Sequence, residues 1–236
     1  MIKAGIAGAQ TPMAGELLRI LIHHPEVDLK VLYASGMNGR NVTTCHHGFI
    51  GEDVPVISDR LDPNSLDVIF LTEDSAIGRE IVGNPQKWEE LRVIDLSPGR
   101  FDNWDAADME YGLSEINRKG LVRGATRSII PTSAAALSLI ALYPLATYLL
   151  LPSSLKIEVT APKDVVEHLS SEKIEKEVAR QLKKAQNSFG GNISYSFVAN
   201  KSGRVMRLKC IMDCSLPLEE IEKIYQGIYD DHNFNI

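Results

Sequence analysis

The chain has 236 residues, of which 44% are hydrophobic and 24% charged, a composition typical of a globular protein of one elaborated domain or two small ones. This balance excludes a collagen-like, coiled-coil or disordered chain. The formal net charge is −6 and no long block of like charges occurs, so neither nucleic acid nor an anionic membrane is expected as a partner.

The cysteine content indicates a reducing compartment. The three cysteines, Cys45, Cys210 and Cys214, are an odd number in a chain too long to need disulfides. The first residues lack the basic start, apolar stretch and cleavage site of a secretory signal. We therefore expect a cytoplasmic protein.

The first half of the chain alternates β-branched runs with amphipathic stretches. The expected elements are a strand at 2–7, a helix at 13–24, and strands at 27–33, 68–71 and 92–96. A parallel sheet with helices on both faces accounts for this order. The fold class is therefore α/β, and residues 1–124 are expected to form a Rossmann-like domain of the NAD(P)-binding type.

After residue 124 the pattern predicts a smaller α+β domain, residues 125–236. Its expected elements are a helix at 132–151, a strand at 155–160, a helix at 171–187, strands at 192–198 and 205–214, and a helix at 218–229. Ser170 or Ser171 is expected to cap the second helix, and Gly190-Gly191 to end it. A turn at 200–203 predicts a hairpin and a layer of the split βαβ type.

One apolar stretch, residues 134–151, reaches the lower length limit of a membrane span. It contains Ser138, Pro144 and Thr147 and lacks a basic flank. A buried helix is therefore expected, with a membrane segment as the alternative.

The first candidate site lies where the first strand turns into the first helix. Its residues are Gly5, Gly8, Ala9, Gln10 and Thr11. In a dinucleotide fold, glycines here let the backbone approach a pyrophosphate that rests on the helix N-terminus. However, Thr11 takes the middle glycine position, where its Cβ would crowd a positive φ, and Pro12 lacks an N–H. A plain strand-to-helix turn is the alternative.

Several blocks of sequence resemble one known family. They are Lys3-Ala-Gly-Ile-Ala-Gly8-Ala9, Gly15-Glu16-Leu17-Leu18-Arg19-Ile20-Leu21, His24-Pro25-Glu26-Val27, Asp67-Val-Ile-Phe70-Leu71, Val93-Ile-Asp95-Leu96-Ser97 and Tyr111-Gly112-Leu113-Ser-Glu115-Ile-Asn117-Arg118. In this order they are similar to N-acetyl-gamma-glutamyl-phosphate reductase, of the aspartate-semialdehyde dehydrogenase superfamily. The resemblance implies NADPH-dependent reduction of an acyl phosphate to a semialdehyde in arginine biosynthesis. It also implies a Cys thiolate at the start of a helix and a His base.

The family's Asn-Pro-Gly-Cys-Tyr-Pro-Thr block aligns with residues 126–132 through the shared Pro-Thr, so its nucleophilic Cys falls on Ile129. An isoleucine cannot form the thioester that this chemistry needs. Thr132 or Ser133 is expected to cap the helix that follows.

Arg127 and Ser128 precede this position and are candidates for binding a small anion at the helix N-terminus. The alternative for Arg127 is an ordinary surface cation. The hydroxyl of Ser128 has no positioned base in the sequence, so it is not expected to replace the nucleophile.

Further parts of the family's pattern are missing. Residues 161–167 replace a glycine-rich substrate loop, residues 195–200 contain no histidine where the base is expected, and the chain stops at Ile236 before the family's closing segment. We expect a diverged and inactive or altered relative, a pseudoenzyme. The alternative is an active NAD(P)-dependent oxidoreductase with another substrate or with unrecognised catalytic groups.

NADP is the possible cofactor, but weak binding is expected. Ser35 stands where the family tends to place an Arg near the adenosine phosphate. With Thr11 and Pro12 in the loop, the expected dissociation constant is weaker than about 100 μM, roughly −5.5 kcal/mol. No metal is expected: Cys45-His46-His47 are adjacent, and adjacent residues rarely converge on one ion.

The chain itself is the expected partner, as a homodimer or dimer of dimers. Two helices can cover one face of the second domain's sheet, which carries many apolar residues: Ile193, Tyr195, Phe197, Met206, Leu208, Cys210 and Met212. A second, exposed apolar face would need burial against a copy, with Tyr195 or Met206 in or beside the interface. Cys210 and Cys214 are expected on one face of a strand, as core or interface side chains.

Overall fold

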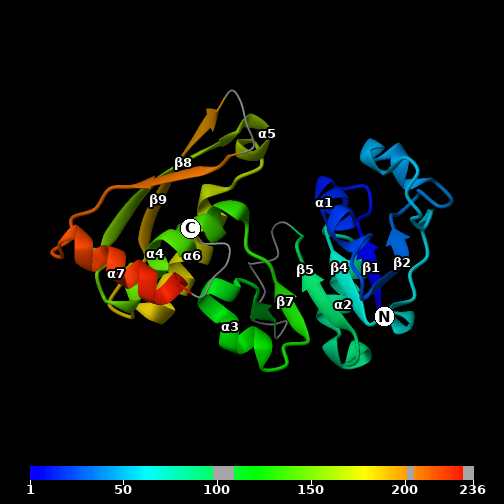
Figure 1. Cartoon of the computed structure of the whole chain (residues 1–236), viewed down its shortest axis with the longest axis horizontal. Helices are drawn as coiled ribbons and strands as arrows, with labels where there is room; N and C mark the ends of the chain where they lie inside the picture. The colour runs from blue at the N-terminus through cyan, green and yellow to red at the C-terminus, as the bar shows by residue number, and fades with distance from the viewer. Residues whose placement is uncertain (98–108, 201–204, 231–236) are drawn as a thin grey trace. The chain divides into compact units, whose positions relative to one another are not determined.

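The structure, a computed structural model, describes residues 1–97, 109–200 and 205–230 (Figure 1). It divides into a first unit, Met1–Gly112 with Lys119–Ile130, and a second unit, Leu113–Arg118 with Pro131–Ile236. The predicted boundary at residue 124 would cut off strand β7, Arg127–Ile129, from the first sheet, although β7 pairs there with two strands.

The first unit contains a seven-stranded parallel sheet in the order β3-β2-β1-β4-β5-β7-β6. Its strands are β1 Ile2–Ala7, β2 Val27–Tyr33, β3 Ile57–Ser58, β4 Val68–Leu71, β5 Arg92–Asp95, β6 Glu110–Tyr111 and β7. The chain leaves β1 toward β2 on one side and later resumes at β4 on the other (Figure 1). This reversal between β1 and β4 is the point at which open α/β sheets bind ligands, beyond the carboxyl ends of the strands.

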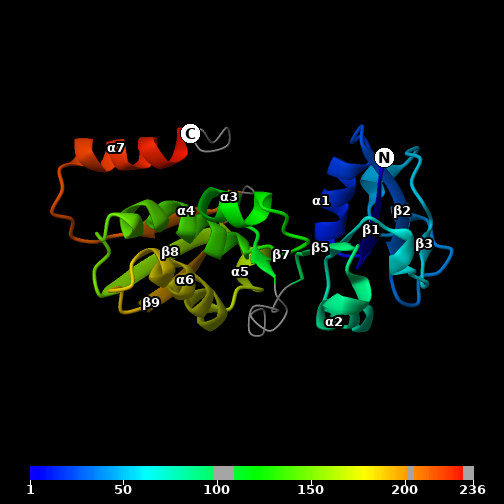
Figure 2. The same cartoon turned by 90° about the horizontal axis from the view of Figure 1, so that it is seen from below.

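Helices α1, Pro12–Leu21, and α2, Ala76–Gly83, lie on opposite sides of this sheet (Figure 2). The expected Rossmann-like fold is therefore confirmed. Leu18 and Leu21 of α1 are buried against Ile6 and Leu32 of the sheet. Helix α1 ends at Leu21, earlier than the predicted end at residue 24. Pro25 disfavours a helical conformation at His24, the residue before it. The short helical turns are η1 Val42–Thr44, η2 His47–Phe49, η3 Pro63–Ser65 and η4 Pro85–Trp88.

The second unit contains a three-stranded sheet in the order β10-β8-β9, made of β8 Ser154–Pro162, β9 Asn192–Asn200 and β10 Arg207–Cys210. Strand β8 pairs in parallel with β9 and antiparallel with β10. The predicted hairpin is wrong, because β9 and β10 flank β8 and do not pair. Residues 201–203 of its predicted turn lie outside the described residues. The predicted split βαβ arrangement is also wrong, because the parallel strands β8 and β9 pair directly, with no strand between them.

Helix α3, Ser114–Val122, begins in the second unit and ends in the first. The other helices of the second unit are α4 Ser133–Thr147, α5 Lys163–Val166, α6 Ser171–Ala185 and α7 Leu218–Tyr229. Ser170 is the N-cap residue of α6, without a side-chain capping bond. Gly190-Gly191 do not end α6 as predicted. The C-cap is Gln186, whose side chain accepts from Leu151 N (3.0 Å) and donates to Leu151 O (2.9 Å).

Helix α4 is the apolar segment of the sequence, and it is buried as expected, with Ala134, Leu139 and Ala146 fully covered. It ends at Thr147, earlier than predicted. Among the described residues, no helix is both long enough and apolar enough to cross a membrane.

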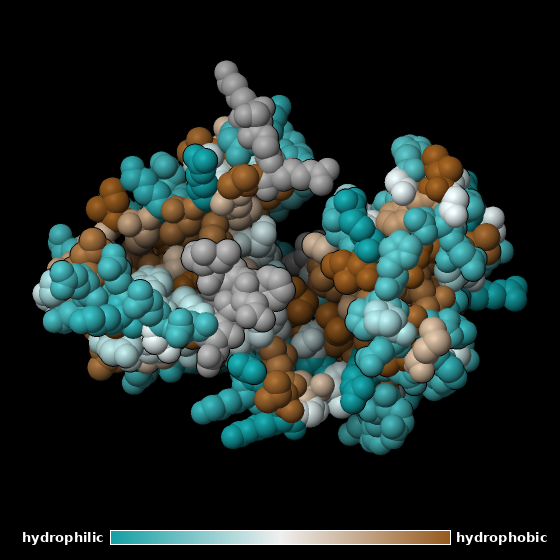
Figure 3. All heavy atoms as spheres, viewed as in Figure 1, coloured by the Kyte–Doolittle hydropathy of each residue, from teal (hydrophilic) through white to brown (hydrophobic). Residues whose placement is uncertain are grey.

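Pro144 inside α4 explains how α7 packs on it. Proline has no N–H, so the carbonyl of Ile140 loses its helical partner. Tyr229 Oη donates to this carbonyl at 2.7 Å, and Tyr225 Oη donates to that of Ala141. Helix α7 lies along α4 (Figure 2) and presents hydrophilic side chains to solvent (Figure 3). The carbonyl that Pro144 leaves without a helical partner thus accepts a hydrogen bond from α7.

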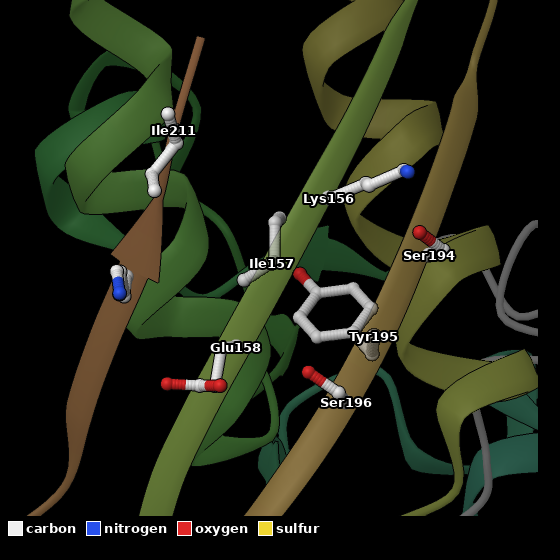
Figure 4. Close-up of a pocket in the computed structure, with 8 residues that line it drawn as sticks. Lys156, Ile157, Glu158, Ser194, Tyr195, Ser196 and Ile211 are labelled. Atoms are coloured by element: carbon white, nitrogen blue, oxygen red, sulfur yellow. The ribbon is translucent and has the colours of Figure 1, made fainter.

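The apolar residues of the second sheet share one face. Ile193, Tyr195 and Phe197 alternate along β9 with exposed residues, and Met206, Leu208, Cys210 and Met212 do so along and beside β10. The other face mixes polar and apolar side chains, with Val198, Val205 and Ile211 exposed on or beside its strands. It forms an open hollow of about 570 Å³ (Figure 4), lined by Lys156, Ile157, Glu158, Ser194, Tyr195, Ser196, Lys209 and Ile211. The apolar residues that the sequence analysis named therefore lie on the helix-covered side, because a strand's alternation places every second side chain there. Cys214 is exposed and lies beyond the end of β10.

Candidate functional site

The β1–α1 loop, residues 8–11, lies at the carboxyl end of β1. Gly8 has φ +94°, and a Cβ there would come within 2.5 Å of Thr72 Oγ1. Thr11 caps α1 in extended backbone, φ −76°, and accepts from Ala14 N at 3.2 Å. The crowding expected at Thr11 is therefore wrong, because the left-handed conformation falls on Gly8.

Hydroxyl groups connect this loop to the end of β4. Thr11 Oγ1 donates to Thr72 Oγ1 at 2.9 Å. The buried Thr72 hydroxyl lies 2.9 Å from each of two carbonyl oxygens, those of Ala7 and Gly8, and donates to them. The α1 cap, the loop and β4 form one hydrogen-bonded structure at the reversal point of the sheet.

A carboxylate covers the same loop. The Cβ that Gly8 lacks would lie 2.8 Å from Glu73 Cγ, so the Glu73 side chain packs directly on the glycine. Gln10 Nε2 donates to Glu73 Oε2 at 2.5 Å. The sequence analysis missed Glu73, which lies 63 residues from Gln10 in the chain; only the pairing of β1 with β4 brings them together.

The remaining predicted loop residues have packing roles or are exposed. A Cβ on Gly5 would lie 2.6 Å from the Leu66 side chain, and Ser35 is exposed. Ala9 is fully buried, and its carbonyl accepts from His46 Nε2 at 2.8 Å. His46 therefore closes over the loop. Within the described parts of the chain, no three His, Cys, Asp or Glu side chains are placed to hold a metal ion.

Strand β7 contains the predicted anion-binding residues and the nucleophile position. Arg127 is 6% exposed, and its Nη2 donates to Ile81 O at 2.5 Å in the last turn of α2. The surface-cation alternative is therefore wrong, and the guanidinium is placed favourably at a helix C-terminus. Ser128 is half-buried, in register with Ile94 and Glu110. Ile129 is 1% exposed.

The start of α4 has its own cap and its own carboxylate. Thr132 accepts from Ala135 N at 3.4 Å, so the predicted cap is confirmed. Its hydroxyl donates to Glu177 Oε2 at 3.4 Å, and Glu177, on α6, is 6% exposed. A buried anion is stabilised at the positive end of a helix. A carboxylate on the apolar face of α6, between Ile174 and Val178, is the sequence signal that could have identified it.

Tyr195 lies where the family resemblance places its base. Its Oη donates to Ser138 Oγ at 2.6 Å, and Ser138 Oγ donates to Ala134 O at 2.7 Å. Burial raises the pKa of Tyr195 far above its usual value of about 10. The ring stacks on Phe197 with centroids 5.8 Å apart. The phenol therefore holds its proton and supports the packing of β9 on α4.

Comparison with known proteins identifies relatives of this arrangement. Residues 3–123 match the family described as semialdehyde dehydrogenase, NAD binding domain. The N-acetyl-gamma-glutamyl-phosphate reductase of Phocaeicola vulgatus is 30% identical, over 99% of this chain and 78% of that protein. The reductase of Parabacteroides distasonis is 28% identical with the same coverage.

Solved structures of aspartate semialdehyde dehydrogenases share the fold. The Candida albicans enzyme, solved with NADP, matches 95% of this chain and 75% of its own, with TM-score 0.62 and 15% identity. The Vibrio cholerae enzyme II matches 95% and 76%, with TM-score 0.64 and 13% identity. At these identities the likeness concerns the fold alone.

Proposed function

The chain belongs to the N-acetyl-gamma-glutamyl-phosphate reductase family, and from this premise we propose that it keeps the family's fold without its reductase reaction. The observation that carries the proposal is Ile129, a buried aliphatic side chain at the nucleophile position. Acyl-phosphate reduction through a thioester needs a nucleophile that attacks the acyl carbon, displaces phosphate and leaves when hydride has been delivered. Isoleucine has no lone pair for the first step.

The second unit also lacks a proton acceptor at the expected place. Tyr195 is neutral, half-buried and engaged with Ser138, and Phe197 has no titratable group. A general base needs a pKa near the working pH. The environment of Tyr195 moves its pKa in the opposite direction.

The start of α4 supports the same conclusion. Glu177 Oε2 already accepts from the Thr132 hydroxyl, so a phosphate anion approaching this helix end competes with the chain's own carboxyl group for the cap. A small anion bound by Arg127 and Ser128 stays a prediction, and the bond from Arg127 to Ile81 gives it little support.

The test is turnover by the purified full chain. N-acetyl-glutamyl phosphate with NADPH, and the arsenate-assisted reverse reaction, are followed by absorbance of the nicotinamide, with the Phocaeicola vulgatus reductase as the positive control. We expect no rate above the protein-free blank. A rate comparable to the control would support the alternative, an active oxidoreductase with unrecognised catalytic groups.

We further propose that the chain forms a homodimer or dimer of dimers in the cytoplasm. The three free cysteines fit a reducing compartment. Because the Tyr195 hydroxyl bonds to Ser138 inside the unit, the sheet surface offered to a copy is the open face with Lys156, Lys209 and the exposed Ile211. Light scattering at micromolar concentration tests this, and a mass near the 26.1 kDa of one chain would contradict it.

A further inference from the structure

We infer that the β1–α1 loop is occupied by the chain's own Glu73, so that the dinucleotide the fold family implies is excluded. A pyrophosphate site at this loop needs an open glycine surface, free backbone N–H donors and no competing negative charge. The residues present fail each of these three requirements. The inference concerns binding, and it holds or fails independently of the proposed loss of catalysis.

The glycine surface is covered. In a dinucleotide site, the missing side chain of the glycine after β1 gives the phosphate access to the backbone. Here the space beside Gly8 is filled by Thr72 Oγ1 and by Cβ and Cγ of Glu73, which lie 2.5, 3.2 and 2.8 Å from the position of an added Cβ. The glycine admits the chain's own side chains at the place where a ligand would lie.

Most of the donors are used. Pro12 has none, and the other engaged amides bond as follows: Gly8 and Ala9 to Tyr33 O, Thr11 to Gly8 O, Ala14 to Thr11 Oγ1, and Gly15 to Thr11 O. From Gly8 to Gly15, the amides of Gln10 and Met13 are those with no acceptor in the described chain. Two separated amides are a poor substitute for the converging donors of a phosphate-binding helix start.

The charge is unfavourable. Glu73 is held by Gln10, a neutral amide that fixes the carboxylate on the loop without cancelling its charge. The adjacent Asp74 differs, because its carboxylate pairs with Arg79 at 2.9 Å on the exposed surface. A pyrophosphate with two negative charges would therefore meet the carboxylate of Glu73 at the loop itself.

The experiment is isothermal calorimetry with NADPH and NADH on the full chain and three variants. Glu73→Ala removes both the filling and the charge, Glu73→Gln removes only the charge, and Asp74→Asn is the matched control that removes the neighbouring charge. We expect a dissociation constant weaker than about 100 μM for the parent chain. We expect at least tenfold tighter binding for Glu73→Ala, a smaller gain for Glu73→Gln, and no change for Asp74→Asn.

Each outcome decides the inference. Low-micromolar binding by the parent chain would overturn it, as would folded Glu73 variants that bind no better. An equal gain in affinity for Asp74→Asn would show that the lower negative charge of the region, and not removal of Glu73 from the loop, improves binding. Circular dichroism checks folding, and should Glu73→Ala fail to fold, the isosteric Glu73→Gln alone decides through its gain or lack of gain. Tight binding without turnover would overturn this inference and leave the proposed function standing.

Discussion

The β1–α1 loop and the start of α4 look alike, and we propose that they have lost their expected ligands in different ways. Each helix begins at a threonine cap, Thr11 or Thr132. The Thr132 hydroxyl donates to Glu177, whereas Glu73 packs on Gly8 in the loop that precedes Thr11. At the loop the decisive residue type, Gly8, is retained and its space is filled. At the second region, Ile129 stands where the family resemblance places the nucleophile.

The comparison distinguishes a site that the chain's own side chain occupies from a site whose reacting residue has another side chain. Glu73 is only half-buried and is held by one side-chain bond, so one substitution can remove it. Glu177 is buried within the packing of α4 and α6, and no substitution there restores a nucleophile at Ile129. A binding site lost by occupation is recoverable, whereas a reaction lost by replacement of several groups is not.

The largest expected effect tests whether Gly8 still determines the loop. Gly8→Ala combines a strained positive φ with a clash against Thr72, so the free energy of unfolding should fall by about 3 to 5 kcal/mol. Gly36 has φ +72° with no atom within 4 Å of an added Cβ, so Gly36→Ala should cost about 1 kcal/mol. Urea denaturation measures both. Equal losses would mean that the contact with Thr72 has no energetic weight.

The next effect is the pH dependence of the free energy of unfolding that two tyrosines of the second unit cause. Burial raises the pKa of Tyr195 and Tyr229 in the folded chain, while unfolded phenols ionise near about pH 10. Both states are protonated below this range, so this contribution to stability is constant there. Above it the unfolded state releases protons first, and the free energy of unfolding should fall by about 1.4 kcal/mol per phenol between pH 9 and 11.

Tyr195→Phe should reduce the fall in the free energy of unfolding between pH 9 and 11 by the contribution of one phenol. Tyr148, whose side chain is 56% exposed, gives the matched control, and Tyr148→Phe should leave the fall unchanged. Urea titrations at pH 9 and 11 measure it. An unchanged fall in Tyr195→Phe would contradict the protonated, buried phenol on which the absence of a base rests.

A smaller effect tests the contact between α4 and α7. Tyr229→Phe should cost about 1 kcal/mol, because the Ile140 carbonyl loses its donor. Pro144→Ala restores an N–H for that carbonyl, so Tyr229→Phe should cost less in the Pro144→Ala background. Additive losses in this double-mutant cycle would show that the tyrosine does not compensate for the proline.

The sequence predicted the first sheet better than the second for a physical reason. Strands 2–7, 27–33 and 68–71 are matched to the residue, because each is a short segment of strand-forming residues: 68–71 is a buried apolar run, and 27–33 carries Asp28 and Lys30 between apolar residues. The alternation of β9 is the same whether it pairs with β8 or with β10. The sequence therefore predicted β9 as a strand correctly but assigned it the wrong partner, β10 in place of β8.

The sites divide in the same way. Gly8, Thr132 and Ile129 could be identified because their roles are local or follow from alignment with the family. Glu73 could not, because its contact with Gly8 depends on the pairing of distant strands. Arg127 was assigned to a helix start, whereas the strand that contains it turns its side chain toward α2.

The smallest expected effect is on catalysis, and it tests replacement directly. Ile129→Cys restores the family's nucleophile type in β7, at a side chain that is 1% exposed. We expect the purified variant to show no turnover of N-acetyl-glutamyl phosphate above the parent chain, because transition-state stabilisation is shared among groups that act together. Tyr195 remains protonated, and Glu177 remains beside the cap of α4. A buried thiol in apolar surroundings is also a poor nucleophile.

The accessibility of the thiol in Ile129→Cys shows how an absence of turnover is to be interpreted. Reaction with a thiol reagent in the native state should be at least about a hundredfold slower at residue 129 than at Cys214, because a buried site reacts only after local opening. Cys214 is exposed in the same molecule and so serves as the internal control. Rapid labelling without turnover would confine the defect to the missing base and substrate contacts. Turnover by Ile129→Cys, with or without Glu73→Ala, would mean that the remaining groups are present and that one residue separates this chain from its active relatives.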